Sequence, residues 1–414
     1  MFQHLFTLIW NRTRANALLV AELFLSFVVL FGLGSLVAVV TLAMRQPPGF
    51  AYEDVWELRL TTNNDQTPQN PTLRRLLAQL RATPGVADVS LAAFGTPFST
   101  YIMSSNIRVE NKPLVSGAEV QADDHFGPLL HLQLLEGRWF DPRDDAGRLP
   151  PIIINRELRQ TLFGTGPALG QAVRSSHSSN PKEMREGRVV GVTGSYRPGG
   201  DLGAPMPAVF VRGVLADSTV TMFSHTLLVR VRPGSGAVLE EQLVRTVAAI
   251  TKTWSTSVIT LSDSRAAGLE TALAPIWAVG LVCAFLLLNV ALGLFGALWQ
   301  AIGQRRTEIG LRRAVGATGL GISEQFVVET LLLTTLAVGP GLLLAVQFPL
   351  LNAFGQPPVV YAVGTGLALV LVYGFAVLCA VQPSWQAAAI RPAVALREEW
   401  RRASGGKCGF RLSS

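Results

Sequence analysis

Residues 271–304 read TALAPIWAVGLVCAFLLLNVALGLFGALWQAIGQ, and residues 305–318, which follow, read RRTEIGLRRAVGAT. The first stretch lies between Glu270 and Arg305 and contains no charged residue. A helix needs about 20 apolar residues to cross the hydrocarbon layer of a membrane. The stretch is longer than that, so it predicts a transmembrane helix.

Two other charge-free stretches, residues 23–44 and 330–389, are also long enough to cross a membrane, and the second is long enough for two spans with a turn near 350–358. The composition agrees with a chain divided between lipid and water, since 49% of residues are hydrophobic, 15% are charged and the mean hydropathy is +0.36. Four transmembrane helices are predicted, at residues 17–44, 271–302, 323–349 and 359–384.

Arginines predict the orientation of these helices. Four of them follow the second helix and four follow the last, and the cytoplasmic side of a membrane protein carries such an excess. They are Arg305, Arg306, Arg312, Arg313, Arg391, Arg397, Arg401 and Arg402. We therefore expect a protein of the inner (plasma) membrane with both termini in the cytoplasm. The net charge of +7 is interpreted as topology, and no nucleic-acid partner is expected.

The remaining segments follow from this orientation. Residues 1–16 have apolar side chains at helical spacing and predict an amphipathic cytoplasmic segment, unless they only extend the first helix. Residues 303–322 are expected to form a cytoplasmic loop and residues 385–414 a cytoplasmic tail. Residues 45–268 should form a large extracytoplasmic domain.

The extracytoplasmic domain has a strand–helix–strand pattern at each end, at residues 55–91 and 225–261. Two such units can pair as a ferredoxin-like split βαβ layer. Residues from about 115 to 215 lie between them and contain strand signals at 152–154 and 188–192 with a short helix near 156–162. The fold expected is therefore membrane α-helical with an outer α/β domain that carries a β-rich insertion.

Catalytic motifs are missing from the sequence. Its histidines and cysteines have no zinc-site spacing, and the acids of Asp123-Asp124-His125 suit a helix-start turn better than a cation site. Residues 191–195 resemble a strand end more than a nucleophile elbow. No GxxxxGK[ST] motif occurs, so the chain is not expected to hydrolyse ATP by itself. We expect no cofactor, metal or catalytic residue, and we expect Glu22 and Glu329 to pair with nearby arginines instead of relaying protons.

The loop 303–322 carries the strongest local signal. Its basic sequence has apolar residues at Ile309, Leu311, Ala314 and Val315, and it stops at Gly316-Ala317. This pattern predicts a short amphipathic helix that lies on the membrane or docks in a partner's groove, although the arginines could also be topology markers alone.

The loop resembles the MacB/FtsX-type ABC permease family, whose mark is R-x-E-I-G-[IL]-R-x-A-x-G-A. The sequence matches it at Arg306, Glu308, Ile309, Gly310, Leu311, Arg312, Ala314, Gly316 and Ala317. The tail at residues 390–397, and Asp124-His125-Phe126 with residues 135–140 in the outer domain, resemble that family too.

This resemblance implies a porter part with an inserted sabre part in the outer domain. It also implies a homodimer, or a pair of related permeases, bound to a cytoplasmic ABC ATPase that we expect on a separate chain. The residues expected to couple to that ATPase are Arg306, Glu308, Ile309, Gly310, Leu311, Arg312, Ala314 and Gly316. Motion would pass to the outer domain for efflux or export, with a periplasmic adaptor or substrate as a further partner. Two alternatives are activation of a cell-wall hydrolase and a membrane-anchored sensor.

Overall fold

The computed structural model describes residues 13–61, 63, 69–99, 102–110, 112–177, 184–213 and 225–388. The chain forms two compact units, of which one is Ala43–Ala272 and the other comprises the residues on either side of it. Residues 1–12 of the expected amphipathic segment and residues 389–414 of the expected tail lie outside the described residues.

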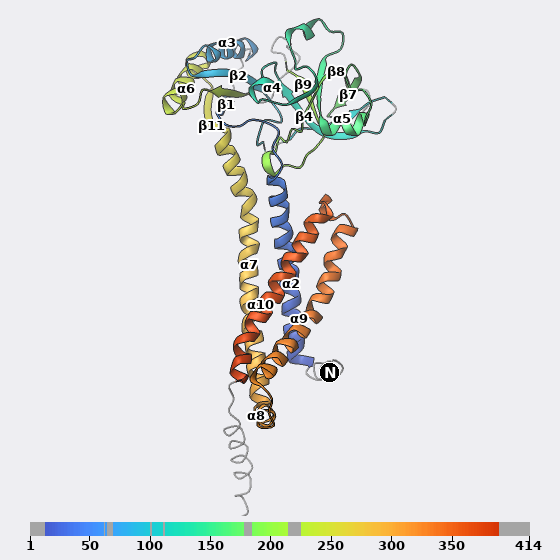
Figure 1. The fold of residues 1–414 in the computed structure, drawn as a ribbon. Coiled ribbons are helices and arrows are strands. Elements are labelled where there is room, and N and C mark those ends of the chain that lie inside the picture. The colour runs from blue at the N-terminus through green and yellow to red at the C-terminus, as the bar shows by residue number, and fades with distance from the viewer. Residues whose placement is uncertain are drawn as a thin grey trace, which may run out of the picture. The chain divides into compact units, whose positions relative to one another are not determined.

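One subdomain of the outer unit is built from the two ends of its sequence. It contains β1 (Val55–Thr61), α3 (Gln69–Arg81), β2 (Val86–Ala92), β10 (His225–Val231), α6 (Ala237–Thr251) and β11 (Ser255–Thr260). The strands lie in the order β11-β1-β10-β2, and neighbours are antiparallel. Figure 1 shows α3 and α6 on the same side of these strands. The order confirms the predicted ferredoxin-like split βαβ layer.

Alternation along the strands explains why helices cover one face only. Successive side chains of a strand point to opposite faces, and Trp56, Leu58 and Leu60 of β1 all point toward α3 and α6. Burying a side chain of this size is worth about 1.5–3 kcal/mol. The core of this layer consists of Trp56, Leu58, Leu60, Leu73, Leu76, Leu77, Leu80, Val86, Val89, Leu91, Leu227, Val229, Val231, Leu239, Leu243, Val247 and Trp254.

The insertion between β2 and β10 closes into a barrel. Its strands are β3 (Ser104–Arg108), β4 (Val115–Ala122), β5 (Leu134–Gly137), β6 (Pro151–Asn155), β7 (Ala172–Ser176), β8 (Arg185–Thr193) and β9 (Ala208–Arg212). They run in the order β4-β3-β7-β8-β6-β9, and β9 pairs back onto β4. The predicted β-rich insertion is confirmed, and closure leaves these strands without open edges except where β5 is added to β8.

Short helices complete the insertion: α4 (Phe126–Leu129), α5 (Arg156–Phe163), and the 3-10 turns η1 (Pro142–Ala146) and η3 (Gly200–Leu202). Asn155 begins α5, since its Oδ1 accepts hydrogen bonds from Leu158 N at 3.0 Å and from Ala208 N at 2.9 Å. One side chain thus caps a helix and fixes the neighbouring strand, and α5 buries Leu158 and Leu162 in the barrel core.

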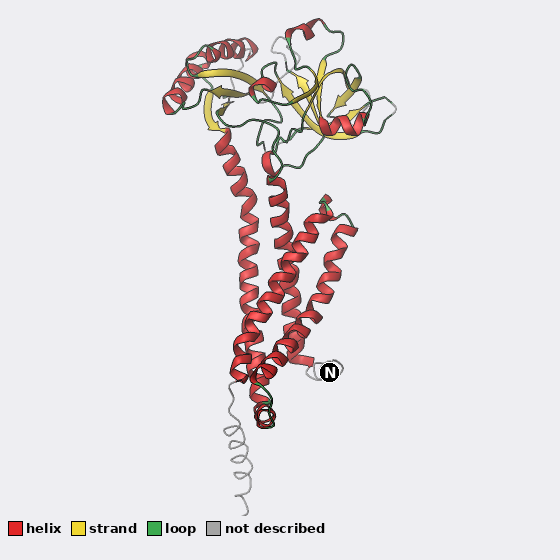
Figure 2. Ribbon diagram, in the orientation of Figure 1, coloured by secondary structure: helices red, strands yellow, loops and turns green. Residues whose placement is uncertain are grey.

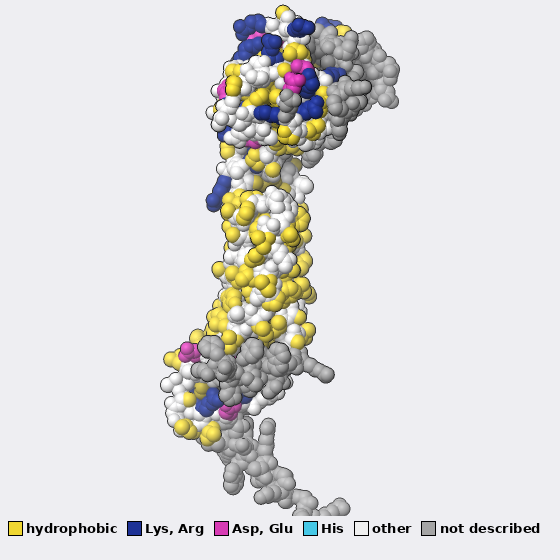
Figure 3. Space-filling model, turned by 90° about the vertical axis from the view of Figure 1, so that its right-hand side faces the viewer, with side chains coloured by type: hydrophobic (Ala, Val, Ile, Leu, Met, Phe, Trp, Pro, Cys, Tyr) yellow, Lys and Arg dark blue, Asp and Glu magenta, His cyan; other side chains and the backbone are white. Residues whose placement is uncertain are grey.

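The second unit is helical, as Figure 2 shows. Among the described residues, four helices are long and apolar enough to span a membrane. They are α2 (Thr13–Met44), α7 (Leu261–Gln304), α9 (Gly319–Leu350) and α10 (Pro358–Ala388). On the face drawn in Figure 3, hydrophobic side chains cover the middle of the helices. The four-helix prediction is confirmed, although α7 begins at Leu261, ahead of the expected residue 271.

Small residues let the helices of this unit approach closely. A Cβ atom on Gly34 of α2 would lie 3.0 Å from Gly364 Cα in α10, and one on Gly341 of α9 would lie 2.4 Å from a ring carbon of Phe27. Close backbone approach at small residues is how membrane helices gain van der Waals contact without a hydrophobic driving force.

Candidate functional site

The helix expected in the loop 303–322 is present as α8 (Arg306–Ala314). Gly316 ends it with φ +106°, a conformation that glycine adopts at little cost, and Ala317 N donates to Arg312 O at 2.9 Å. Thr318 then begins α9, since its Oγ1 accepts from Gly321 N at 3.2 Å. The residues from 314 to 318 therefore form a tight corner between two capped helices.

Ile309 holds α8 against the helical unit. Its side chain is 4% exposed and packs in a cluster with Leu298 of α7, Ile322 and Phe326 of α9, and Ala380 of α10. Gly310 beside it is also buried. These two residues of the motif are thus part of the packing of the unit itself.

The other apolar residues of α8 lie on the opposite side. Leu311, Ala314 and Val315 are spaced at i, i+3 and i+4, which places them on one helix face. Leu311 is 56% exposed and Val315 is 82% exposed, while Leu320 at the start of α9 is 81% exposed. We call Glu308, Leu311, Arg312, Ala314, Val315 and Leu320 the α8 surface. The prediction from sequence grouped Ile309 with Leu311 as apolar residues of one helix. It did not include Leu320.

Charged side chains fix the geometry around α8. Arg312 forms an ion pair with Glu308, one turn earlier, and its Nη1 donates to Gln325 Oε1 at 3.1 Å. Arg305 Nη1 lies 3.3 Å from Glu329 Oε2, and both side chains are less than 20% exposed. The expected pairing of Glu329 with an arginine is confirmed. The side chain of Arg306 lies outside the described residues, although its backbone is in α8.

Glu22 behaves differently from Glu329. Its Oε2 is buried beside Gly293 of α7 and has no hydrogen-bond partner among the described residues. The expected pairing with an arginine is therefore not seen within that part of the chain.

The acidic group at Asp123 is internally paired. Asp123 accepts hydrogen bonds from Ser90 Oγ at 2.6 Å and Leu91 N at 3.0 Å, and Asp124 binds Arg212 Nε at 2.6 Å. Burial raises the pKa of Asp123, and the bonds from Ser90 and Leu91 oppose that rise. The group stands in the turn before α4, which confirms the predicted turn, although the Asp123 side chain is only 16% exposed. No metal-binding cluster occurs among the residues the structure describes.

Residues 191–195 also follow their predicted form. β8 ends at Thr193, and Ser195 Oγ donates to Glu157. Ser195 therefore stands beyond a strand end, without the strand-to-helix turn of a nucleophile elbow.

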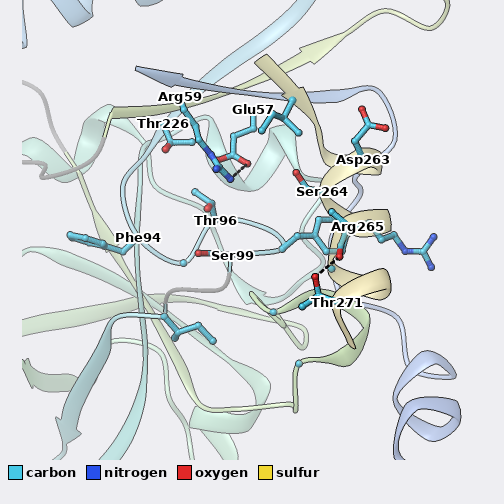
Figure 4. A pocket seen from close by; sticks show the side chains of 18 of the residues that line it. Glu57, Arg59, Phe94, Thr96, Ser99, Thr226, Asp263, Ser264, Arg265 and Thr271 are labelled. Atoms are coloured by element: carbon cyan, nitrogen blue, oxygen red, sulfur yellow. Dashed lines mark hydrogen bonds and ion pairs between the residues drawn. The ribbon is translucent and has the colours of Figure 1, made fainter. Parts of the chain in front are cut away.

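The outer unit has a cavity of about 1390 Å³ on the face of the sheet opposite α3 and α6. Figure 4 shows Glu57 and Arg59 of β1 meeting within it, near Thr96. The Glu57 carboxylate is 4% exposed and binds Arg59 Nε at 2.7 Å. Apolar residues line other parts, among them Phe98, Ile259 and Leu269. No sequence pattern indicated this cavity, because its walls come from segments distant in the chain.

Known proteins resemble this chain over most of its length. Residues 17–246 match the model of the MacB-like periplasmic core domain, and residues 280–392 match the FtsX-like permease C-terminal model. The macrolide export ATP-binding/permease protein MacB 1/2 of Paracoccus denitrificans is 28% identical over 285 residues, which are 66% of this chain and 39% of that protein. MacB of Marinobacter nauticus is 24% identical over 305 residues, or 68% of this chain and 44% of that protein. The chain thus spans about two fifths of the length of these relatives.

Two solved structures share some likeness with about half of the chain. The periplasmic region of MacB from Actinobacillus actinomycetemcomitans has a TM-score of 0.38 and 14% identity, and covers 52% of this chain and 93% of that one. The extracellular domain of the transporter YknZ from Gram-positive bacteria has a TM-score of 0.35 and 16% identity. The match covers 49% of this chain and 99% of that one. Because the periplasmic core model alone matches more than half of the 414 residues, the chain belongs to the MacB/FtsX-like family of ABC transporter permeases.

Proposed function

We propose that this permease receives ATP-driven motion from a cytoplasmic ABC ATPase and transmits it to its outer unit, for efflux or export. The proposal includes a second permease copy, an inner-membrane location and cytoplasmic termini. The macrolide export named for its relatives supports efflux as the class of activity.

The single observation that carries the proposal is the two-sided build of α8. Its inner side is anchored by Ile309 to α7, α9 and α10, so a push on α8 reaches three of the long helices directly. Its outer side offers apolar and charged groups to a partner. If the arginines of α8 served only to orient the protein in the membrane, the helix would need neither the packed inner side nor the apolar outer side.

Within the motif, we assign different roles to the proposed coupling residues. Leu311, Ala314 and the Glu308–Arg312 pair would contact the ATPase. Ile309 and Gly310 would pass the motion inward, and Gly316 would set the corner between α8 and α9. Arg306 belongs to the proposed contact through its place in the motif.

The test is co-purification of the detergent-solubilised permease with ATPases of its host. We expect the double variant Leu311→Asp/Val315→Asp to lose the ATPase that the wild type retains, because two carboxylates would enter an apolar contact. Glu308→Arg should weaken binding less, because it exchanges one charged side chain for another and leaves the apolar contact of Leu311 and Val315 in place. The matched control is Val238→Asp on α6, because Val238 is 83% exposed and lies outside α8.

Retention of the ATPase by the double variant at the wild-type level would remove α8 as the docking element. Absence of any ATPase from the wild type, where a known permease retains its own, would contradict the proposal as a whole.

A further inference from the structure

The segment that leaves α2 runs directly against residues 195–197. Arg197 N donates to Pro48 O at 3.0 Å. Gly49 has φ +88°, and a Cβ atom there would lie 1.7 Å from Ser195 O, so no other residue fits at this crossing without moving the backbone. The outer end of α2 is thus in fixed contact with this loop inside the outer unit.

Arg197 makes the contact specific. Its side chain is 1% exposed, and its guanidinium donates to Ala43 O at 3.3 Å and Gln46 O at 2.8 Å at the end of α2. It also donates to Asp201 O and Gly203 O, each at 2.6 Å. The last carbonyls of a helix lack partners within it and form the negative end of its dipole, so a buried cation suits this place. Burial lowers the pKa of Arg197, and Asp201 partly offsets that effect.

The same loop is also tied to α7. The Asp201 carboxylate, 7% exposed, forms an ion pair with Arg265 Nε near the start of α7. Arg265 lies over the ring of Tyr52, with 4.9 Å between its guanidinium carbon and the ring centroid. Residues 197–201 therefore hold one link to α2 and one link to α7.

We propose that Arg197, Asp201 and Arg265 form a clamp that couples the outer ends of α2 and α7, with the Asp201–Arg265 ion pair as the joint that opens. α2 and α7 are the two helices through which the chain passes between its units. Arg197 is held by four carbonyls of two segments, whereas Arg265 is held to the loop by one carboxylate, so the weaker link is on the α7 side. All three are positioning residues, and their role in transmitting motion rests on the proposed function.

Opening the joint would also change the cavity, because Gly199, Asp201 and Gly203 line it together with Arg265. A change in the distance between α2 and α7 would therefore alter the cavity walls.

The test measures that distance by pulsed electron paramagnetic resonance in the full chain. Spin labels at Arg45→Cys and Glu270→Cys, both exposed, are placed in a background without Cys283, Cys379 and Cys408, and labelled chains are diluted with unlabelled ones. We expect a single narrow distance with the clamp intact and its loss in Asp201→Asn and in Arg265→Gln. The matched control is Arg143→Gln, which breaks the exposed ion pair with Asp141 elsewhere in the same unit.

A second arm separates coupling from a merely structural role. For this arm the spin labels at positions 45 and 270 are attached through oximes to a ketone-bearing unnatural amino acid, so that only the clamp positions carry thiols. In the pair Asp201→Cys/Arg265→Cys, a bifunctional methanethiosulfonate reagent should then restore the narrow distance, and reduction should abolish it again. Where an ATPase co-purifies, we expect the bridged pair to lose the ATP-dependent change in this distance.

Unchanged distances in Asp201→Asn and Arg265→Gln would overturn the clamp, as would an ATP-dependent change that persists in the bridged pair. The first arm needs no ATPase, so its outcome is independent of whether the docking proposal holds. Arg197→Lys is an additional variant, expected to broaden the distance further, and the other two variants carry the test if it does not fold.

Discussion

The two faces of strand β1 have different surroundings, since one packs in a core and the other lines a cavity. Trp56, Leu58 and Leu60 enter the core under α3 and α6, while Glu57 and Arg59 line the cavity on the other face. The two sets of side chains alternate along one strand, whose backbone pairs with β10 on one edge and β11 on the other. Stability and surface chemistry can thus be altered separately at neighbouring positions.

The largest effect is expected on the covered face. Leu58→Ala empties part of a core in which Leu58 has no exposed surface, and such truncations cost about 2–5 kcal/mol. Native-state hydrogen exchange of β1 and β10 measures this as a loss of protection. The control is Thr61→Ala, an exposed truncation on the open face of the same strand. Equal losses in the two variants would break the comparison between the faces.

A smaller effect is expected on the open face. A double-mutant cycle with Glu57→Gln and Arg59→Met should give a coupling of about 1 kcal/mol, because the carboxylate is buried but Arg59 is 56% exposed and screened by water. The same exchange experiment on β1 measures it.

The matched pair for this cycle is Glu241→Gln with Arg245→Met on α6, where both side chains are more than 60% exposed. Its coupling should be about 0.3–0.5 kcal/mol, as for other exposed i,i+4 pairs. A coupling at Glu57–Arg59 no larger than this would show that burial of Glu57 adds nothing.

The smallest effect on stability is expected at Asp141, whose ion pair with Arg143 lies at η1, away from both faces of β1. Hydrogen bonding from Arg143 lowers the pKa of Asp141 to about 2. A carboxyl group whose folded pKa is depressed contributes stability above its unfolded pKa of about 4 and loses it as the pH falls toward the folded value.

The difference in η1 amide protection between wild type and Arg143→Gln should therefore be present at pH 6 and shrink between about pH 4 and pH 2. A difference that stays constant over this range would mean that the pair does not lower the pKa of Asp141.

Periodicity in the sequence was enough to predict most elements of the fold. Three long charge-free stretches, the last of which holds two spans, correspond to α2, α7, α9 and α10. The repeated strand–helix–strand pattern corresponds to the split βαβ layer. Each of these signals depends on residues close in the chain, where spacing fixes which side chains share a face. The same holds for α8, which ends at Ala314, just before the glycine stop at Gly316 that the sequence predicts.

The candidate site could be predicted only in part. The motif located α8, but apolar character alone could not tell the buried Ile309 from the exposed Leu311 and Val315. That difference depends on α7, α9 and α10, which supply the cluster around Ile309. Glu22 and Glu329 likewise read alike in the sequence, and only Glu329 has an arginine beside it among the described residues.

The sequence by itself determined that this protein spans a membrane with four helices, carries an α/β outer domain and has a helix after the second span. Those properties follow from local periodicity and from the solvation of backbone and charge. Tertiary structure alone decided that the insertion closes through β4 and β9, and that Arg197 reaches Ala43 across more than 150 residues of chain. Such contacts join segments that no spacing rule relates, because the chain between them can take any path that satisfies its own hydrogen bonds.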